Sequence, residues 1–170
     1  MGFLDFLTST KRPATGTAVL PADEVRKRLL AINRPTAPYQ VVDGASDHVD
    51  VIAEWKIIDA TWHEVFGKAG LSNAFRILIK LHPEGHEAWA ADREYTVAWS
   101  AGLPTVTLAA SAFHGQSQEI ELGKAYGFTE ILAPGQVYNY RFETSEMRNP
   151  LQEAVNSCGW TYKGIAFGKL

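Results

Sequence analysis

Most of the chain alternates between apolar and polar residues with a period of two, which is typical of strands in a sheet with one buried face. The clearest example runs from Phe75 to Leu81, where every second residue is apolar. The turn-forming sequence Pro83-Glu84-Gly85 follows, and the alternation resumes at His86, so we predict a hairpin over residues 74–91. Further extended segments are predicted at residues 39–43, 48–56, 94–100, 105–113, 117–124, 136–144 and 161–167.

Three stretches have the apolar periodicity of helices instead. The first follows Pro21 and ends at Asn33, and the second covers residues 59–70. The third begins at Asn149-Pro150, a favourable start because proline at the first helical position needs no hydrogen-bond acceptor. Its apolar stripe consists of Leu151, Ala154, Val155 and Cys158. We therefore predict that the only cysteine is a small apolar side chain on a buried helix face.

The order of these elements indicates the fold class. No long helix separates successive strands after residue 74, so parallel crossover connections have no room. We predict an α+β, β-rich fold with a largely antiparallel, strongly curved sheet or half-barrel of about nine strands and three short helices. The helix over residues 150–158 is expected to pack on or in this sheet. A barrel around a helix and a sandwich with a capping helix both satisfy the pattern.

Composition limits the class of protein. The chain has 170 residues, of which 46% are hydrophobic and 21% charged, which excludes intrinsic disorder and suits one globular domain. The net charge of -3 gives no reason to expect nucleic-acid binding. A single cysteine excludes an internal disulfide, and no secretory signal is evident, so we expect a cytoplasmic protein.

The N-terminal residues differ from the rest of the chain. Residues 1–18 are predicted to be an apolar arm and linker, and residues 19–170 a single globular α+β domain. The arm carries the large apolar side chains Phe3, Leu4, Phe6 and Leu7. These side chains are expected to contact protein, through docking or self-association, or a membrane surface.

Motifs with established chemistry are absent from the sequence. It contains no P-loop, no dinucleotide-binding glycine motif, no H-E-x-x-H zinc motif and no C-x-x-C pair, so we predict no cofactor. His82 and His86 flank a turn, but a metal site would need a third ligand that the local sequence does not supply. We therefore predict no metal site.

Aromatic residues make up 11% of the chain, and several share one strand face. Either they form a bulky core or they line a concave pocket for a small hydrophobic molecule.

Arg93 has the same parity as the aromatic side chains and interrupts their pattern. We favour a bulge or turn at residues 92–94, because a strand from 87 to 100 would exceed the usual length of about 3–10 residues. The alternative is that Arg93 pairs with a carboxylate or a ligand anion. The candidate ligand-binding residues are Arg93, Trp89, Tyr95 and Trp99.

These observations favour a non-enzymatic binding or interaction module with an aromatic-lined β-scaffold. Its expected partner is a hydrophobic, lipid-like or anionic ligand, or a protein. The first alternative is a small cytoplasmic enzyme with a dispersed acid/base site, and the second is a structural homo-oligomer subunit. The residues to test for the enzyme are Asp59, Asp92, Arg93, Glu94 and His114.

Overall fold

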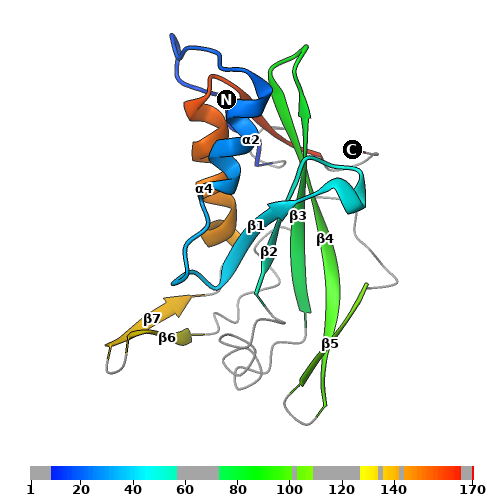
Figure 1. Cartoon of the computed structure of the whole chain (residues 1–170), viewed down its shortest axis with the longest axis vertical. Coiled ribbons are helices and arrows are strands. Elements are labelled where there is room, and N and C mark those ends of the chain that lie inside the picture. The colour runs from blue at the N-terminus through cyan, green and yellow to red at the C-terminus, as the bar shows by residue number, and fades with distance from the viewer. Residues whose placement is uncertain are drawn as a thin grey trace.

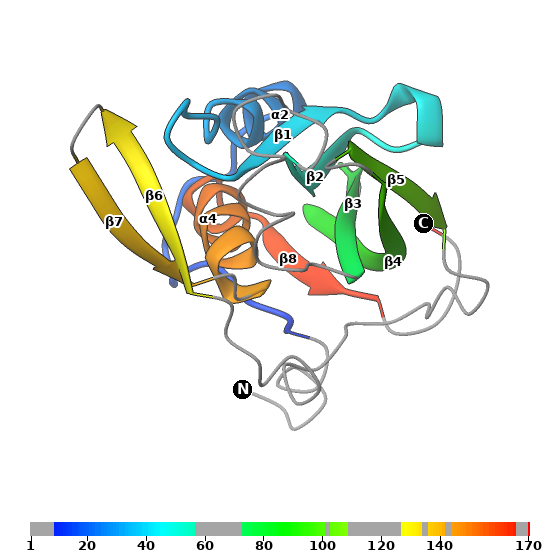
Figure 2. The same ribbon diagram turned by 90° about the horizontal axis from the view of Figure 1, so that it is seen from below.

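A mixed β-sheet with two α-helices on one face forms the described part of the chain, in a computed structural model (Figures 1 and 2). The structure describes residues 9–56, 73–100, 103–108, 127–133, 136–141, 144–165 and 170. Side chains are described for residues 9–56, 76–93, 95–98, 145–165 and 170. Because the structure combines a mixed sheet with two helices, the predicted α+β class is confirmed.

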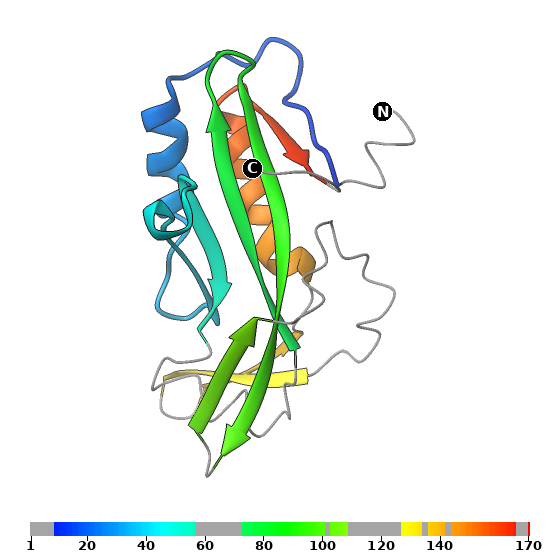
Figure 3. The same ribbon diagram turned by 90° about the vertical axis from the view of Figure 1, so that its right-hand side faces the viewer.

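Five strands of the sheet follow one another in sequence order, each antiparallel to its neighbour. They are β1 (Tyr39–Asp43), β2 (Val51–Trp55), β3 (Asn73–His82), β4 (Glu87–Ser100) and β5 (Leu103–Leu108). The strand β8 (Thr161–Gly164) pairs in parallel with the first residues of β4, on the edge that β5 uses further along (Figure 3). A separate hairpin consists of β6 (Gly127–Ala133) and β7 (Gln136–Arg141).

The helices α2 (Ala22–Leu30) and α4 (Thr144–Ser157) contact each other and cover one face of the sheet. The main core lies between them and the strands. Large side chains at its centre that are at least 98% buried include Val25, Leu29, Val41, Val51, Ile77, Ile79, Met147, Leu151, Trp160 and Tyr162. We call the opposite face of the sheet the outer face.

The first predicted helix is confirmed, and a side chain after it fixes β1. α2 begins after Pro21 and buries Val25 and Leu29, as the apolar spacing indicates. Asn33 then pairs with the outermost strand: its amide donates to the carbonyl of Val41 at 2.6 Å and accepts from the amide of Val41 at 2.6 Å. The Asn33 side chain therefore takes the place of a neighbouring strand at this edge.

The third predicted helix is present but begins earlier than the sequence indicates. α4 begins at Thr144, which also corrects the strand predicted over residues 136–144, and Pro150 lies inside the helix. Contacts of Met147 and Arg148, both buried, hold this first turn against the sheet, so tertiary packing outweighs the unfavourable proline. α4 ends before Gly159, whose φ of 74° suits glycine, and a Cβ there would lie 2.6 Å from the carbonyl oxygen of Ala18.

The predicted curvature is wrong. The sheet is neither closed nor strongly curled, so it is not a half-barrel, and the described residues form eight strands and two α-helices. β8 can be parallel to β4 because the two strands are far apart in sequence. The connection between them, which includes α4, is long enough for a crossover. The arm residues Phe3, Leu4, Phe6 and Leu7, the helix over residues 59–70 and the segment 117–124 lie outside the described residues.

The long strand β4 also corrects a prediction. It is continuous from Glu87 to Ser100, and β3 pairs with it through Asp92, Arg93 and Glu94 without a bulge. The strand exceeds the usual length because three neighbours share it: β3 on one edge, and β8 and β5 in turn on the other.

Candidate functional site

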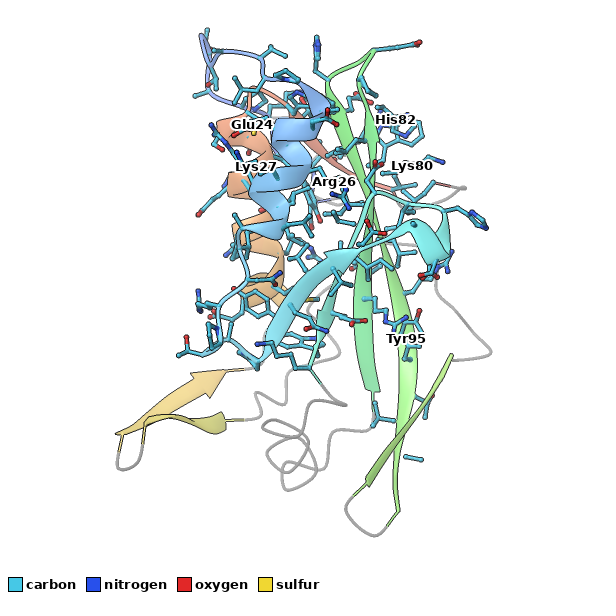
Figure 4. The ribbon with its side chains drawn as sticks, viewed as in Figure 1. Glu24, Arg26, Lys27, Lys80, His82 and Tyr95 are labelled. Carbon is cyan, nitrogen blue, oxygen red and sulfur yellow. The ribbon has the colours of Figure 1, made fainter. Side chains whose placement is uncertain are left out.

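The candidate residues whose side chains are described share the outer face but are spread along β4 and do not gather at one point. Trp89, Arg93 and Tyr95 alternate along β4 and point away from α2 and α4. Figure 4 shows Tyr95 on this side, together with Lys80 and His82 of the neighbouring strand β3. The side chain of Trp99 lies outside the described residues.

Arg93 reaches a carboxylate that the local sequence does not suggest. Its Nη1 lies 3.7 Å from Oδ1 of Asp47, in the short 3-10 helix η1 (Ala45–Asp47) that connects β1 and β2. The Arg93 side chain is 35% exposed and that of Asp47 28% exposed. Arg93 therefore holds the β1–β2 connection over the outer face and remains accessible to solvent.

This half-exposed ion pair leads to a prediction about stability. We expect Arg93→Met to lower the free energy of unfolding by about 0.2–1 kcal/mol, because solvent screens the pair and the Met side chain keeps the apolar contacts. Denaturation in urea measures the change, and Arg26→Met, which removes the exposed Arg26–Asp43 pair, is the matched control. A loss of several kcal/mol for Arg93→Met alone would contradict this assignment and indicate a buried charge pair.

Trp89 lies at the centre of a compact cluster at the turn end of the β3–β4 hairpin. The His82 and Trp89 rings have centroids 4.1 Å apart, and Nζ of Lys163 lies 5.1 Å from the Trp89 centroid. Nε1 of Trp89 donates to Oε2 of Glu87 at 2.6 Å. That hydrogen bond, together with Lys163 at 3.2 Å, lowers the pKa of Glu87 below its usual range, against the raising effect of burial. The carboxylate of Glu87 therefore stays charged and fixes the indole ring.

Lys80 differs from the other cations of this surface. Trp89 lies directly between Lys80 on β3 and Lys163 on β8 in the sheet register. Lys163 pairs with Glu87, Arg93 with Asp47, and Arg76 with Glu54 at 2.8 Å. Lys80 has no carboxylate partner in the part of the chain that the structure describes, so the row across β3, β4 and β8 carries an uncompensated positive charge.

Tyr95 belongs to a second polar row, further along the outer face. The Arg76 guanidinium lies 4.7 Å from the Tyr95 ring centroid and also pairs with Glu54, which accepts from Gln40 at 3.0 Å. These contacts link β1 to β4 across four strands. They also compensate the charge of Arg76, which lies directly opposite Arg93 in the register.

A buried polar cluster on the helix side escaped the sequence prediction. Asp92 accepts from Nη2 of Arg148 at 2.7 Å, and the two side chains are 3% and 7% exposed. The fully buried hydroxyl of Tyr162 lies near both, and burial raises its pKa well above the usual range. Asp92 shares parity with the buried Ala88 and Ala90, but the bulge predicted at residues 92–94 removed the reason to place it on the core face. The partner Arg148, 56 residues away, could not be predicted.

The residues suggested for an acid/base site do not come together. Asp92 lies on the helix side of β4 and Arg93 on the outer face. Asp59, His114 and the side chain of Glu94 lie outside the described residues. Cys158 directly follows the last residue of α4 and is fully buried, so the prediction of a buried side chain is confirmed. Within the described ranges, no three His, Cys, Asp or Glu side chains gather as a metal site would require, and no helix is long and apolar enough to cross a membrane.

Comparisons with known proteins identify no relative: no family model, no curated protein and no solved structure matches this chain. The functional assignment therefore rests on the chemistry of the surfaces described above.

Proposed function

We propose that the protein is a non-enzymatic binding module that contacts a phosphate-bearing partner through the outer face of its sheet. The observation that carries this proposal is the row formed by Lys80, Trp89 and Lys163, in which Lys80 has no carboxylate partner among the described residues. An ammonium group without a counter-charge, beside a rigid indole, favours an anion.

The character of the surface favours an anionic partner over an apolar one. The one large apolar side chain exposed within the described ranges is Val19, which is remote in sequence from the row. The partly exposed side chains of the outer face include cations, aromatic rings and the carboxylates of Asp47, Glu54 and Glu87, each of which already pairs with a cation. The ion pair of Arg93 is long, so a bound phosphate can replace it. Phosphate is favoured because an ammonium group without a carboxylate partner donates charge-assisted hydrogen bonds to phosphate oxygens.

The role of Lys80 gives a direct test by binding. We expect Lys80→Met to weaken binding of inorganic phosphate or of phosphatidylglycerol vesicles by about ten-fold or more, because one charge-assisted hydrogen bond contributes about 1.5–3 kcal/mol. Arg93→Met should weaken the binding of vesicles, whose surface can contact Arg93 as well as Lys80. Titration calorimetry measures the free phosphate, and vesicle sedimentation measures the lipid headgroup.

The control is Lys27→Met, which removes the same charge from the exposed surface of α2 on the other side of the sheet (Figure 4). This variant should bind as the wild type does. An equal loss in Lys27→Met and Lys80→Met would show that only net charge matters, and no binding by the wild type to either probe would refute the proposal.

A further inference from the structure

The edge of β8 that faces away from β4 is covered by residues 9–11, which we call the N-terminal strap. Lys11 and Tyr162 form an antiparallel bridge. The amide of Lys11 donates to the carbonyl of Tyr162 at 2.8 Å, and the amide of Tyr162 donates to the carbonyl of Lys11 at 2.9 Å. In Figure 3 the blue N-terminal segment accordingly lies beside β8. Residues 9–11 of the same chain thus extend the sheet.

α4 contributes a row of donors to the same strap. Nε2 of Gln152 donates to the carbonyl of Ser9 at 2.8 Å, and Nδ2 of Asn156 donates to the carbonyl of Lys11 at 2.9 Å. Four residues of a helix rise about 6 Å, and two residues of a strand rise about 6.6 Å. The two amides therefore match the repeat of backbone carbonyls along an extended chain, whatever its side chains are.

Two further contacts recognise small hydroxyl side chains. Oγ of Ser9 accepts from Nη1 of Arg148 at 3.3 Å, and Oγ1 of Thr10 accepts from the amide of Gly164 at 3.2 Å. The site formed by α4 and the β8 edge therefore favours a segment in which two Ser or Thr residues precede the residue that pairs with β8.

The strap is held in a way that permits replacement. None of residues 9–12 is buried, so the strap inserts no side chain fully into the core. Its contacts with Arg148, Gln152, Asn156 and β8 are hydrogen bonds, which water can replace. Ser9 also has a φ of 53°, in the left-handed region that is unfavourable for a residue with a Cβ.

We propose that α4 and the outer edge of β8 bind an extended, Ser/Thr-containing peptide segment of a partner protein, and that the N-terminal strap occupies this site until the partner displaces it. Strand addition of this kind takes its affinity from backbone hydrogen bonds and its specificity from alternate side chains. The site is distinct from the outer face and does not depend on the function proposed for that face.

A partner segment fits this role better than the strap of a second copy. An exchanged strap would make the same contacts as the tethered one, while the short connection to α2 gives the tethered strap an effective concentration in the millimolar range. Displacement therefore requires a partner that adds contacts of its own beyond the strap positions.

The test weakens the strap and leaves the site unchanged. Lys11→Pro removes the amide that donates to Tyr162. The probe is a fluorescent peptide with the sequence of residues 9–13, which contains the three strap residues, and fluorescence anisotropy measures its binding to the full-length protein. We expect the Lys11→Pro variant to bind the peptide about ten-fold more tightly than the wild type, because its internal competitor is weakened. Thr10→Val, which removes one hydroxyl contact, should act in the same direction and provides a second strap variant.

Variants of the site supply the control. In the Lys11→Pro chain, Gln152→Ala together with Asn156→Ala should weaken peptide binding about ten-fold, since two donors to the peptide backbone are lost. Glu153→Ala, an exposed position on the same helix, should leave binding unchanged. Peptide binding that is equal in the wild type and both strap variants, or that does not depend on Gln152 and Asn156, would overturn the proposal.

Discussion

Asp92→Asn is expected to lower the free energy of unfolding by about 3–5 kcal/mol, because it leaves the Arg148 guanidinium buried without a counter-charge. The asparagine side chain has nearly the same shape, so lost packing contributes little. The midpoint of urea denaturation should therefore fall while the slope of the transition stays constant.

A double variant separates the charge from the packing. In Asp92→Asn combined with Arg148→Met no unpaired charge remains, so the loss should be smaller than the sum of the two single losses. Asp43→Asn is the matched control, because Asp43 pairs with Arg26 on an exposed surface and should cause a much smaller change. Equal effects of Asp92→Asn and Asp43→Asn would contradict the assignment of a buried ion pair.

The elements that the sequence predicts well are those defined by neighbouring residues. The boundaries of β1, the β3–β4 hairpin and the buried side of α2 all follow from alternation, turn residues and helical spacing. In each case the residues that make the pattern are also those that make the contacts. Local periodicity is therefore sufficient for these elements.

Features that depend on distant partners could not be predicted in the same way. The pattern around Arg93 predicted a bulge, because its actual partner, Asp47, belongs to a connection 46 residues earlier and is not evident from the local sequence. The early start of α4 depends on Arg148, whose partner Asp92 lies on another strand. The strap is an equally distant contact, since Ser9 meets Gln152 across 143 residues. Of the proposed binding surface, the sequence indicated the face of β4, but the cations beside it, Lys80 and Lys163, come from β3 and β8.

α4 packs against both the sheet and α2. Substitution of its buried apolar residues is the second change that we expect to have a large effect on stability. Leu151 and Val155 are fully buried between the sheet and α2. We expect Leu151→Ala to lower the free energy of unfolding by about 2–5 kcal/mol, because it removes buried methyl groups and leaves a cavity. Val155→Asp should lower the free energy of unfolding by more than Leu151→Ala does. It places a carboxylate among buried apolar side chains, and neither neighbour in the sequence is a cation.

Chemical denaturation of both variants, followed by circular dichroism, measures these losses. The control is Glu153→Ala, which lies on the exposed side of the same helix and should leave the midpoint close to that of the wild type. Because Gln152 and Asn156 occupy another side of α4, Leu151→Ala should lower global stability while the folded fraction keeps the strap in place. A wild-type midpoint for both Leu151→Ala and Val155→Asp would mean that this face of α4 does not pack against the sheet, and the arrangement of the core described above would be wrong.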